Sequence, residues 1–172
     1  MKNLFKVLFL GVALFVMNGM AQAQMKIAIV NSSEVMDAMP ESATAQKALE
    51  KYANELQSQL QAMGTEYQNK VQDYQANEAT MSNLVKQSKE KEILDLQNRI
   101  QQFQANAQNE LAAKELELLQ PIIEKIQNAI NEIGKAKGFT YVIDRAASGV
   151  IVYVGDDAVD ITKDVKTKVG AK

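Results

Sequence analysis

Two long stretches of this chain place apolar residues at helical spacing on otherwise polar surfaces. In the first stretch the apolar positions are Leu49, Ala53, Leu56, Leu60, Met63, Tyr67, Val71 and Tyr74. In the second they are Ile93, Leu96, Ile100, Phe103, Ala107 and Leu111. Steps of three and four residues are typical of a coiled-coil seam. The pattern therefore predicts two long helices that pair as an antiparallel hairpin, with a seam too thin to form a globular core.

The boundaries of this hairpin follow from cap and turn residues. Ser42 can serve as the N-cap of the first helix, and turn-forming residues predict the connection at residues 78–83. After Leu111 the apolar face widens, and Pro121 should kink the second helix where it enters a more enclosed region. Gly134 or Gly138 can end it. We expect a helical arm over residues 42–134, whose body-ward end follows Pro121.

Short apolar β segments flank the arm on both sides. They are residues 26–30 (KIAIV), 140–144 (TYVID) and 150–154 (VIVYV). The last two, separated by a five-residue loop with a glycine, predict a β-hairpin. A short helix should run from residue 31 to about Met39, ended by Pro40. Asp160 or Thr162 should cap a last helix that ends near Val169.

Three short strands leave edges and apolar faces open within one chain. We therefore predict an α+β fold in which a small β body, residues 24–41 and 135–172, is completed by oligomerisation. A monomeric three-stranded sheet covered by the second helix is the alternative. The residues expected at the interface are Ile27, Ile29, Tyr141, Val142, Val150, Val152 and Val154.

The first 23 residues have the pattern of a cleaved signal peptide. Lys2 and Lys6 precede an apolar run over residues 7–17, and Ala21 and Ala23 supply small residues before a cleavage site at Gln24. A retained anchor is the alternative, but the run is shorter than the ~20 residues that span a bilayer. The pattern predicts export.

Composition excludes several classes of function. Removing two lysines of the signal segment from the 19 Lys+Arg leaves 17, against 21 Asp+Glu, so the mature chain carries −4. A negative chain without a basic patch does not predict nucleic-acid binding. With no His and no Cys, the chain lacks the commonest general base and the commonest metal ligands. Asp156, Asp157 and Asp160 fit a turn and a cap better than a calcium loop. We expect no enzyme, no metal and no cofactor.

The chain resembles the Skp/OmpH-like family of periplasmic chaperones. The resemblance rests on the opening KIAIVNSSEVMDAMPE, the hairpin, LLQPIIEKIQNAINEIGKAKG, and the closing GFTYVID and VIVYVGDDAVDITKDV. It implies a homotrimer whose arms enclose a cavity and hold unfolded outer-membrane β-barrel proteins without ATP. The alternative function is an envelope coiled-coil adaptor that bridges specific partners.

One departure from the family concerns charge. Family members are strongly basic, whereas residues 42–134 carry nine Lys+Arg against 13 Asp+Glu. The difference disfavours lipopolysaccharide or lipid binding and favours capture by apolar contact. The residues expected to touch clients are Tyr52, Met81, Leu84, Val85, Lys86, Lys89, Lys91 and Leu94. For the three lysines a solvated helix face is the competing interpretation.

Overall fold

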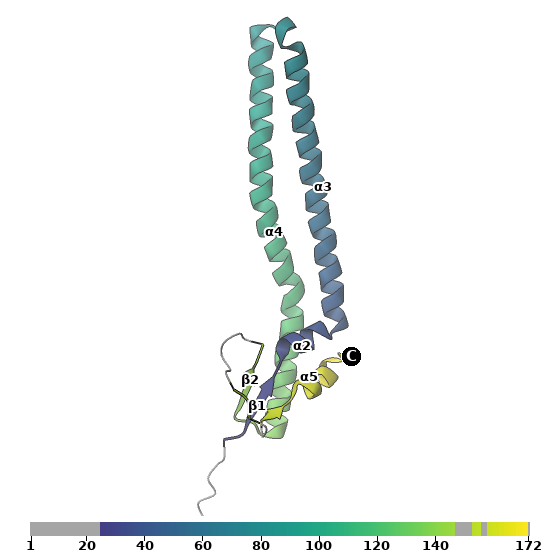
Figure 1. Cartoon of the computed structure of the whole chain (residues 1–172), viewed down its shortest axis with the longest axis vertical. Coiled ribbons are helices and arrows are strands. Elements are labelled where there is room, and N and C mark those ends of the chain that lie inside the picture. Colours follow the sequence, from purple (N-terminus) through teal and green to yellow (C-terminus); the bar gives the residue numbers. More distant parts are fainter. Residues whose placement is uncertain (1–24, 147–152, 156–157, 172) are drawn as a thin grey trace, which may run out of the picture.

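The computed structural model describes residues 25–146, 153–155 and 158–171. Figure 1 shows a long two-helix arm standing on a small body. The arm pairs α3 (Pro40–Asn77) with the first part of α4 (Asn83–Lys137). The body contains the end of α4, three strands and the short helices α2 (Ser32–Asp37) and α5 (Thr162–Val169). This confirms the predicted α+β fold class. The predicted cleavage site at Ala21, Ala23 and Gln24 lies outside the described residues.

The start of α3 corrects one prediction. The helix begins at Pro40, with Met39 as an extended N-cap, so Ser42 lies inside the first turn rather than capping it. Proline fits the first helical position because its fixed φ suits the helix and the missing N–H has no partner there anyway. Pro40 therefore both ends the preceding segment and opens the arm.

The two arm helices are joined by a short polar connection. It consists of a 3₁₀ turn, η1 (Glu78–Thr80), followed by Met81 and Ser82. The Ser82 hydroxyl accepts a hydrogen bond from the Val85 N–H at 3.4 Å and caps α4. Serine is favoured at this place because its oxygen satisfies one of the unpaired N–H groups of the first turn.

Helix α4 runs through 55 residues without a break at Pro121. Figure 1 shows the helix changing direction between its label and the body. It ends at Gly138, which has a φ of 66° and whose N–H bonds the carbonyls of Gly134 and Lys135. Glycine adopts this left-handed conformation without a Cβ penalty. Of the two predicted stops, Gly138 is therefore the observed one, and Gly134 is buried within the helix.

The sheet is parallel, in the order β2-β1-β3. Strand β1 (Ile27–Val30) pairs with β2 (Tyr141–Asp144) and with β3 (Val159–Asp160). The predicted hairpin partner of β2 lies mostly outside the described residues, and Tyr153 and Val154 belong to no strand. Parallel strands require a long crossover, and here the arm itself supplies the crossover between β1 and β2.

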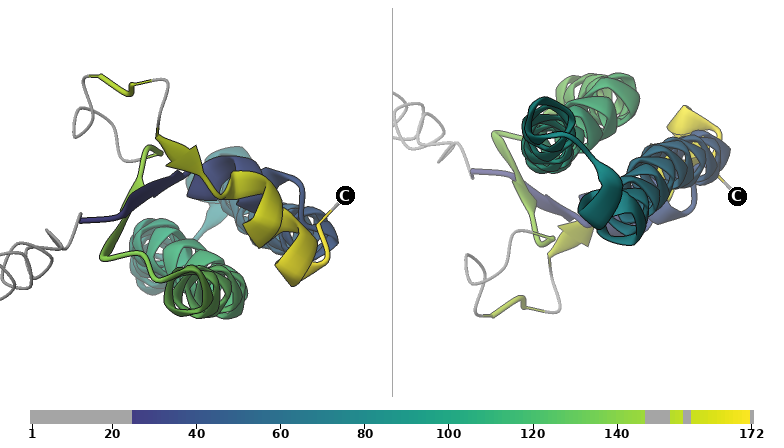
Figure 2. Two further views of the ribbon diagram at one scale, coloured as in Figure 1. Left: turned by 90° about the horizontal axis from the view of Figure 1, so that it is seen from below. Right: turned by 90° about the horizontal axis from the view of Figure 1, so that it is seen from above.

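The body core lies between the inner face of the sheet, the end of α4 and the two short helices (Figure 2). Neither Asp160 nor Thr162, the two predicted caps, is the N-cap of α5: Ile161 is the N-cap and Thr162 is the first helical residue. The Asp160 carboxylate still accepts the Thr162 N–H at 2.8 Å. A single chain thus encloses a core on one face of its sheet. Its buried members include Ala28, Val30, Val35, Met39, Ile122, Ile126, Ala129, Ile133, Ile161, Val165 and Val169.

Candidate functional site

The interface between the two arm helices is only partly closed. Along α3 the sole buried residue is Ala45, and in α4 the sole buried residue before Ile122 is Leu96. Every other seam residue stays half-buried. Two helices cover only one side of each other, so a hairpin without a third helix leaves its seam accessible from both flanks.

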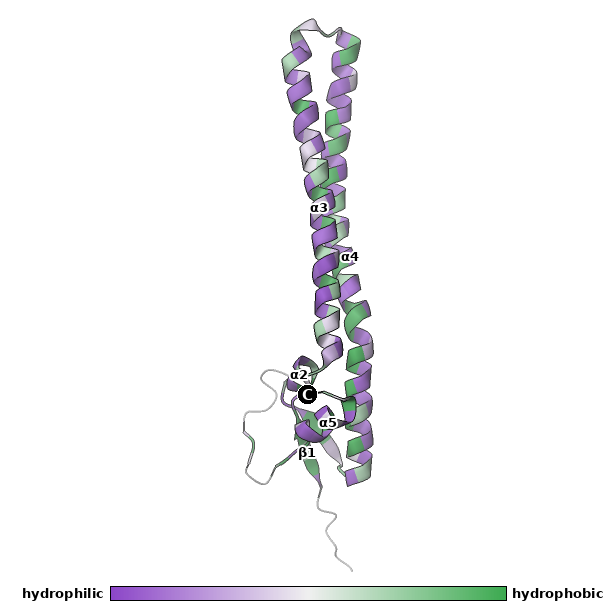
Figure 3. Ribbon diagram, turned by 90° about the vertical axis from the view of Figure 1, so that its right-hand side faces the viewer, coloured by the Kyte–Doolittle hydropathy of each residue, from purple (hydrophilic) through white to green (hydrophobic). Residues whose placement is uncertain are grey.

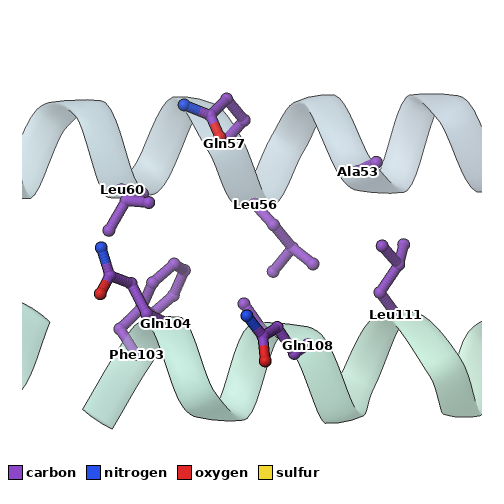
Figure 4. A pocket seen from close by; sticks show the side chains of 9 residues that line it. Ala53, Leu56, Gln57, Leu60, Phe103, Gln104, Gln108 and Leu111 are labelled. Atoms are coloured by element: carbon purple, nitrogen blue, oxygen red, sulfur yellow. The ribbon is translucent and has the colours of Figure 1, made fainter. Parts of the chain in front are cut away.

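A groove opens in the middle of the arm, with a volume of about 530 Å³. Figure 4 shows Leu56 and Leu60 of α3 pointing toward Phe103 and Leu111 of α4. The space remains because the seam includes alanines at Ala53 and Ala107, which lack the volume to fill it. The glutamines at its rim are Gln57, Gln104 and Gln108.

Polar pairs fix the register of the arm helices. The Tyr52 hydroxyl donates to Glu110 Oε2 at 2.9 Å, and this hydrogen bond raises the pKa of Tyr52. Nearer the tip, Glu90 raises the pKa of Tyr74 to about 12 by accepting its hydroxyl hydrogen. Lys89 lies 2.7 Å from Asp73 and lowers the pKa of that carboxyl group. Tyr52 and Lys89, both expected to touch clients, are therefore engaged within the arm.

The other predicted contacts divide by exposure. Leu84, Val85 and Leu94 are exposed, at 77%, 43% and 58% of their surface. Lys91 is also exposed, whereas Met81 and Lys86 are half-buried near the turn. The exposed leucines are available to a partner, while Met81 and Lys86 contribute partly to the tip itself.

Leu116 and Ile123 belong to the widened apolar face that was expected to be enclosed after Leu111, but they are exposed, at 67% and 44%. At ~100° per residue, they fall within about a quarter-turn of Leu84 and Leu94. From Leu84 to Ile123, all residues of α4 on that quarter-turn are exposed. This α4 strip consists of Leu84, Gln87, Lys91, Leu94, Asn98, Gln102, Ala105, Asn109, Ala112, Leu116, Gln120 and Ile123. It lies roughly opposite the arm seam, so reasoning that followed only the seam missed it.

The outer face of the sheet presents a second apolar surface. Because Ile27 pairs with Tyr141 in register, both side chains lie on the face away from the core, together with Ile143. Tyr141 is 57% exposed, and Ile29 is buried. Val142, expected at the same interface, instead packs against the chain's own core. Val150 and Val152 lie outside the described residues, and Val154 is exposed outside any strand.

Hydrogen bonds join the start of α2 to the end of β2. The Asp144 carboxylate accepts the hydroxyl and N–H of Ser32 and the N–H of Ala146. Burial favours its neutral form, but these hydrogen bonds outweigh burial and lower the pKa of Asp144. This carboxylate faces no pocket with other titratable groups, so its role is to hold α2 to β2.

Across the described part of the chain, no cluster of three acidic side chains is placed to hold a metal ion. No helix in the same part combines the length and apolar character needed to cross a bilayer. Hydrophobic residues instead recur along both arm helices and become denser where α4 enters the body (Figure 3). These exposed apolar surfaces of the arm and body suit the binding of unfolded polypeptide chains or of other proteins.

Comparison with known proteins agrees with this fold. Residues 26–169 match the family model described as outer membrane protein (OmpH-like). The chain is 30% identical over 166 residues to the chaperone protein Skp of Photorhabdus luminescens, covering 96% of this chain and 100% of that protein. It is 29% identical to the Skp of Pectobacterium atrosepticum, covering 84% and 88%. These relatives are chaperones rather than enzymes.

A solved structure extends the comparison to three dimensions. The crystal structure of an OmpH-like protein from Caulobacter crescentus CB15 superimposes with a TM-score of 0.72. It shares 18% identity and covers 87% of this chain and 86% of its own. At this level of identity the match supports the fold alone.

Proposed function

The chain belongs to the OmpH-like outer membrane protein family, and from that membership we propose that it is a periplasmic holdase chaperone for unfolded outer-membrane β-barrel proteins. It binds them without ATP and prevents their aggregation on the way to the outer membrane. The observation that carries the proposal is an arm with a half-open seam and exposed leucines, standing on a body with its own core. Many weak apolar contacts suit a mobile, unfolded chain.

The proposed active form is a homotrimer in which the arms surround the client. The exposed outer face of the sheet, with Ile27, Tyr141 and Ile143, supports self-association because apolar faces of this kind are usually covered. The two edge strands of the sheet support it as well. Tyr141→Asp should dissociate the oligomer, which sedimentation velocity would detect as a fall in mass.

The acidic arms shape how clients are captured. With nine Lys+Arg against 13 Asp+Glu over residues 42–134, attraction between charges contributes little to the binding of acidic clients. Capture then depends on apolar contact and confinement, and added salt leaves it nearly unchanged. For the same reason lipopolysaccharide and anionic lipid are not part of the proposal.

The test is light scattering during dilution of a urea-unfolded outer-membrane β-barrel protein into buffer with the mature chain. Suppression near one oligomer per client supports the proposal, and a folded barrel serves as the control that should not bind. Absence of suppression at any excess would overturn the chaperone function and favour an envelope adaptor with one folded partner.

A further inference from the structure

The α4 strip defined above combines exposure with near absence of charge. Its four large apolar residues, Leu84, Leu94, Leu116 and Ile123, are between 44% and 77% exposed. The residues between them are Gln, Asn and Ala, with Lys91 as the single charged member. A helix face that serves only to meet water normally carries many charged residues. The α4 strip is exposed but almost uncharged, so it differs from an ordinary solvated face.

Apart from Lys91, the charged residues of α4 between Leu84 and Ile123 lie beside the strip rather than on it. Asp95, Glu110 and Glu117 project from other sides of the helix at ~100° per residue. On α3 the face away from the seam has no large apolar residue; it includes Lys51, Ser58 and Ala62. The combination of exposed leucines and missing charge is therefore specific to one face of one arm helix.

The strip leads to a mainly apolar groove on the body. Ile123, its last member, also lines this groove of about 340 Å³, together with the apolar residues Val30, Met36, Ile126, Ile130 and Val142 and the polar residues Ser32, Gln127 and Asp144. Ile123 thus belongs both to the exposed helix face and to a concave apolar surface. A polypeptide bound along the strip could place a large apolar side chain in this groove. That side chain would be shielded from water more completely there than on the open helix face.

A second copy of this chain fits the strip poorly. A coiled-coil seam needs large apolar residues every three or four positions. Between Leu94 and Leu116, about 33 Å at ~1.5 Å per residue, the strip offers only Gln, Asn and Ala. Widely spaced apolar sites joined by uncharged polar ones suit an extended chain, whose side chains alternate between apolar and polar.

We propose that the α4 strip and the groove at its end form the client track of the arm, and that its occupant is an extended, apolar-polar alternating segment of an unfolded β-barrel. The inference rests on the chaperone function proposed above. The strip spans ~58 Å and accommodates an extended segment of ~18 residues, roughly two barrel strands. Because the strip itself carries one charge, Lys91, it brings little electrostatic repulsion against segments of an acidic client.

The experiment compares the full mature chain with two double variants. Leu94→Gln/Leu116→Gln removes the apolar sites in the middle of the track without adding charge. Ala62→Gln/Asn69→Gln introduces the same two glutamines at exposed positions on the outer face of α3 and serves as the matched control. Binding of a urea-unfolded outer-membrane β-barrel protein is followed by fluorescence anisotropy at low and high salt, and circular dichroism checks that each variant keeps the helical content of the wild type.

The leucine variant should bind at least about tenfold more weakly at both salt concentrations, since each lost apolar site forfeits a burial contribution. The α3 variant should bind within twofold of the wild type. Photo-crosslinkers at positions 98 and 109 should capture the client, and those at 58 and 62 should not.

Three results would overturn the inference. If the leucine variant binds the client as well as the wild type does, the strip is not the client-binding surface, and the proposed chaperone function is unaffected. Loss of oligomer mass in the leucine variant would assign the strip to contacts between copies. Failure of the wild type itself to bind would overturn the chaperone function and the track together.

Discussion

Leu96 is the residue through which arm stability can be measured most directly. It is 2% exposed and is the one buried residue of α4 outside the region that enters the body. The pairs Tyr52–Glu110 and Lys70–Glu92 set a register that brings Leu96 level with residues 66–67 of α3. The substitution Leu96→Ala removes this contact, and Leu94→Ala, two positions away and 58% exposed, is the matched control.

The expected cost follows from burial. A buried Leu→Ala change costs about 2–5 kcal/mol, and a two-helix arm that can relax toward the lost side chain falls at the low end, about 2 kcal/mol. The control changes the same side chain in the same helix, so helix propensity cancels. At an exposed site its cost should stay within about 0.5 kcal/mol.

Hydrogen exchange measured by mass spectrometry separates the arm from the body. In Leu96→Ala, amides of α3 and α4 near the substitution should exchange about 30-fold faster, since each 1.4 kcal/mol corresponds to about tenfold. Amides of β1 and the end of α4 should keep their wild-type rates. Equal acceleration in both variants would refute the view that seam burial stabilises the arm, and acceleration throughout the body would refute the independence of the two parts.

Three further predictions address other contacts. Gly64→Ala should stabilise the arm by about 0.5–1 kcal/mol, because a Cβ there meets nothing within 4 Å and alanine is the better helix former. Slower amide hydrogen exchange near residue 64 would show this stabilisation. Tyr52→Phe should speed exchange near residue 110 by no more than about fivefold, since it removes one exposed hydrogen bond, and should leave client binding unchanged. In the wild type the lowered pKa of Asp144 favours folding above the unfolded pKa of about 3.9, and this contribution disappears as pH falls through the folded value. Urea unfolding of Asp144→Asn should therefore show lower stability at pH 7 and a shallower decline below pH 4 than the wild type.

The arm could be predicted from sequence because its signal is local and repeated. Residues three and four positions apart meet on one helix face whatever the rest of the chain does. The seam residues from Leu49 to Tyr74, all half-buried, follow that spacing throughout. Errors came where two local rules competed, as at Pro40, whose preference for the first helical position outweighed the capping tendency of Ser42.

The sheet could not be predicted in the same way. Its central strand pairs with segments more than 100 residues away, and β3 is two residues long and carries no periodicity. The apolar segment near β2 suggested a hairpin because closeness in sequence is the only pairing signal that a single sequence offers. Among the candidate contacts, Tyr52 and Lys89 pair with Glu110 and Asp73 on the opposite helix. A pattern along one helix does not show such pairing between helices.

The pairing of β1 with both C-terminal strands sets the order in which the molecule can fold. The arm hairpin closes over short sequence separations and can form while the chain is still incomplete. Strand β1, by contrast, has no partner within the described residues until Tyr141 and Val159 are present. A chain truncated before Tyr141 would keep both arm helices but lack the sheet that anchors them. The body can therefore be completed only after the chain has been synthesised as far as its last helix.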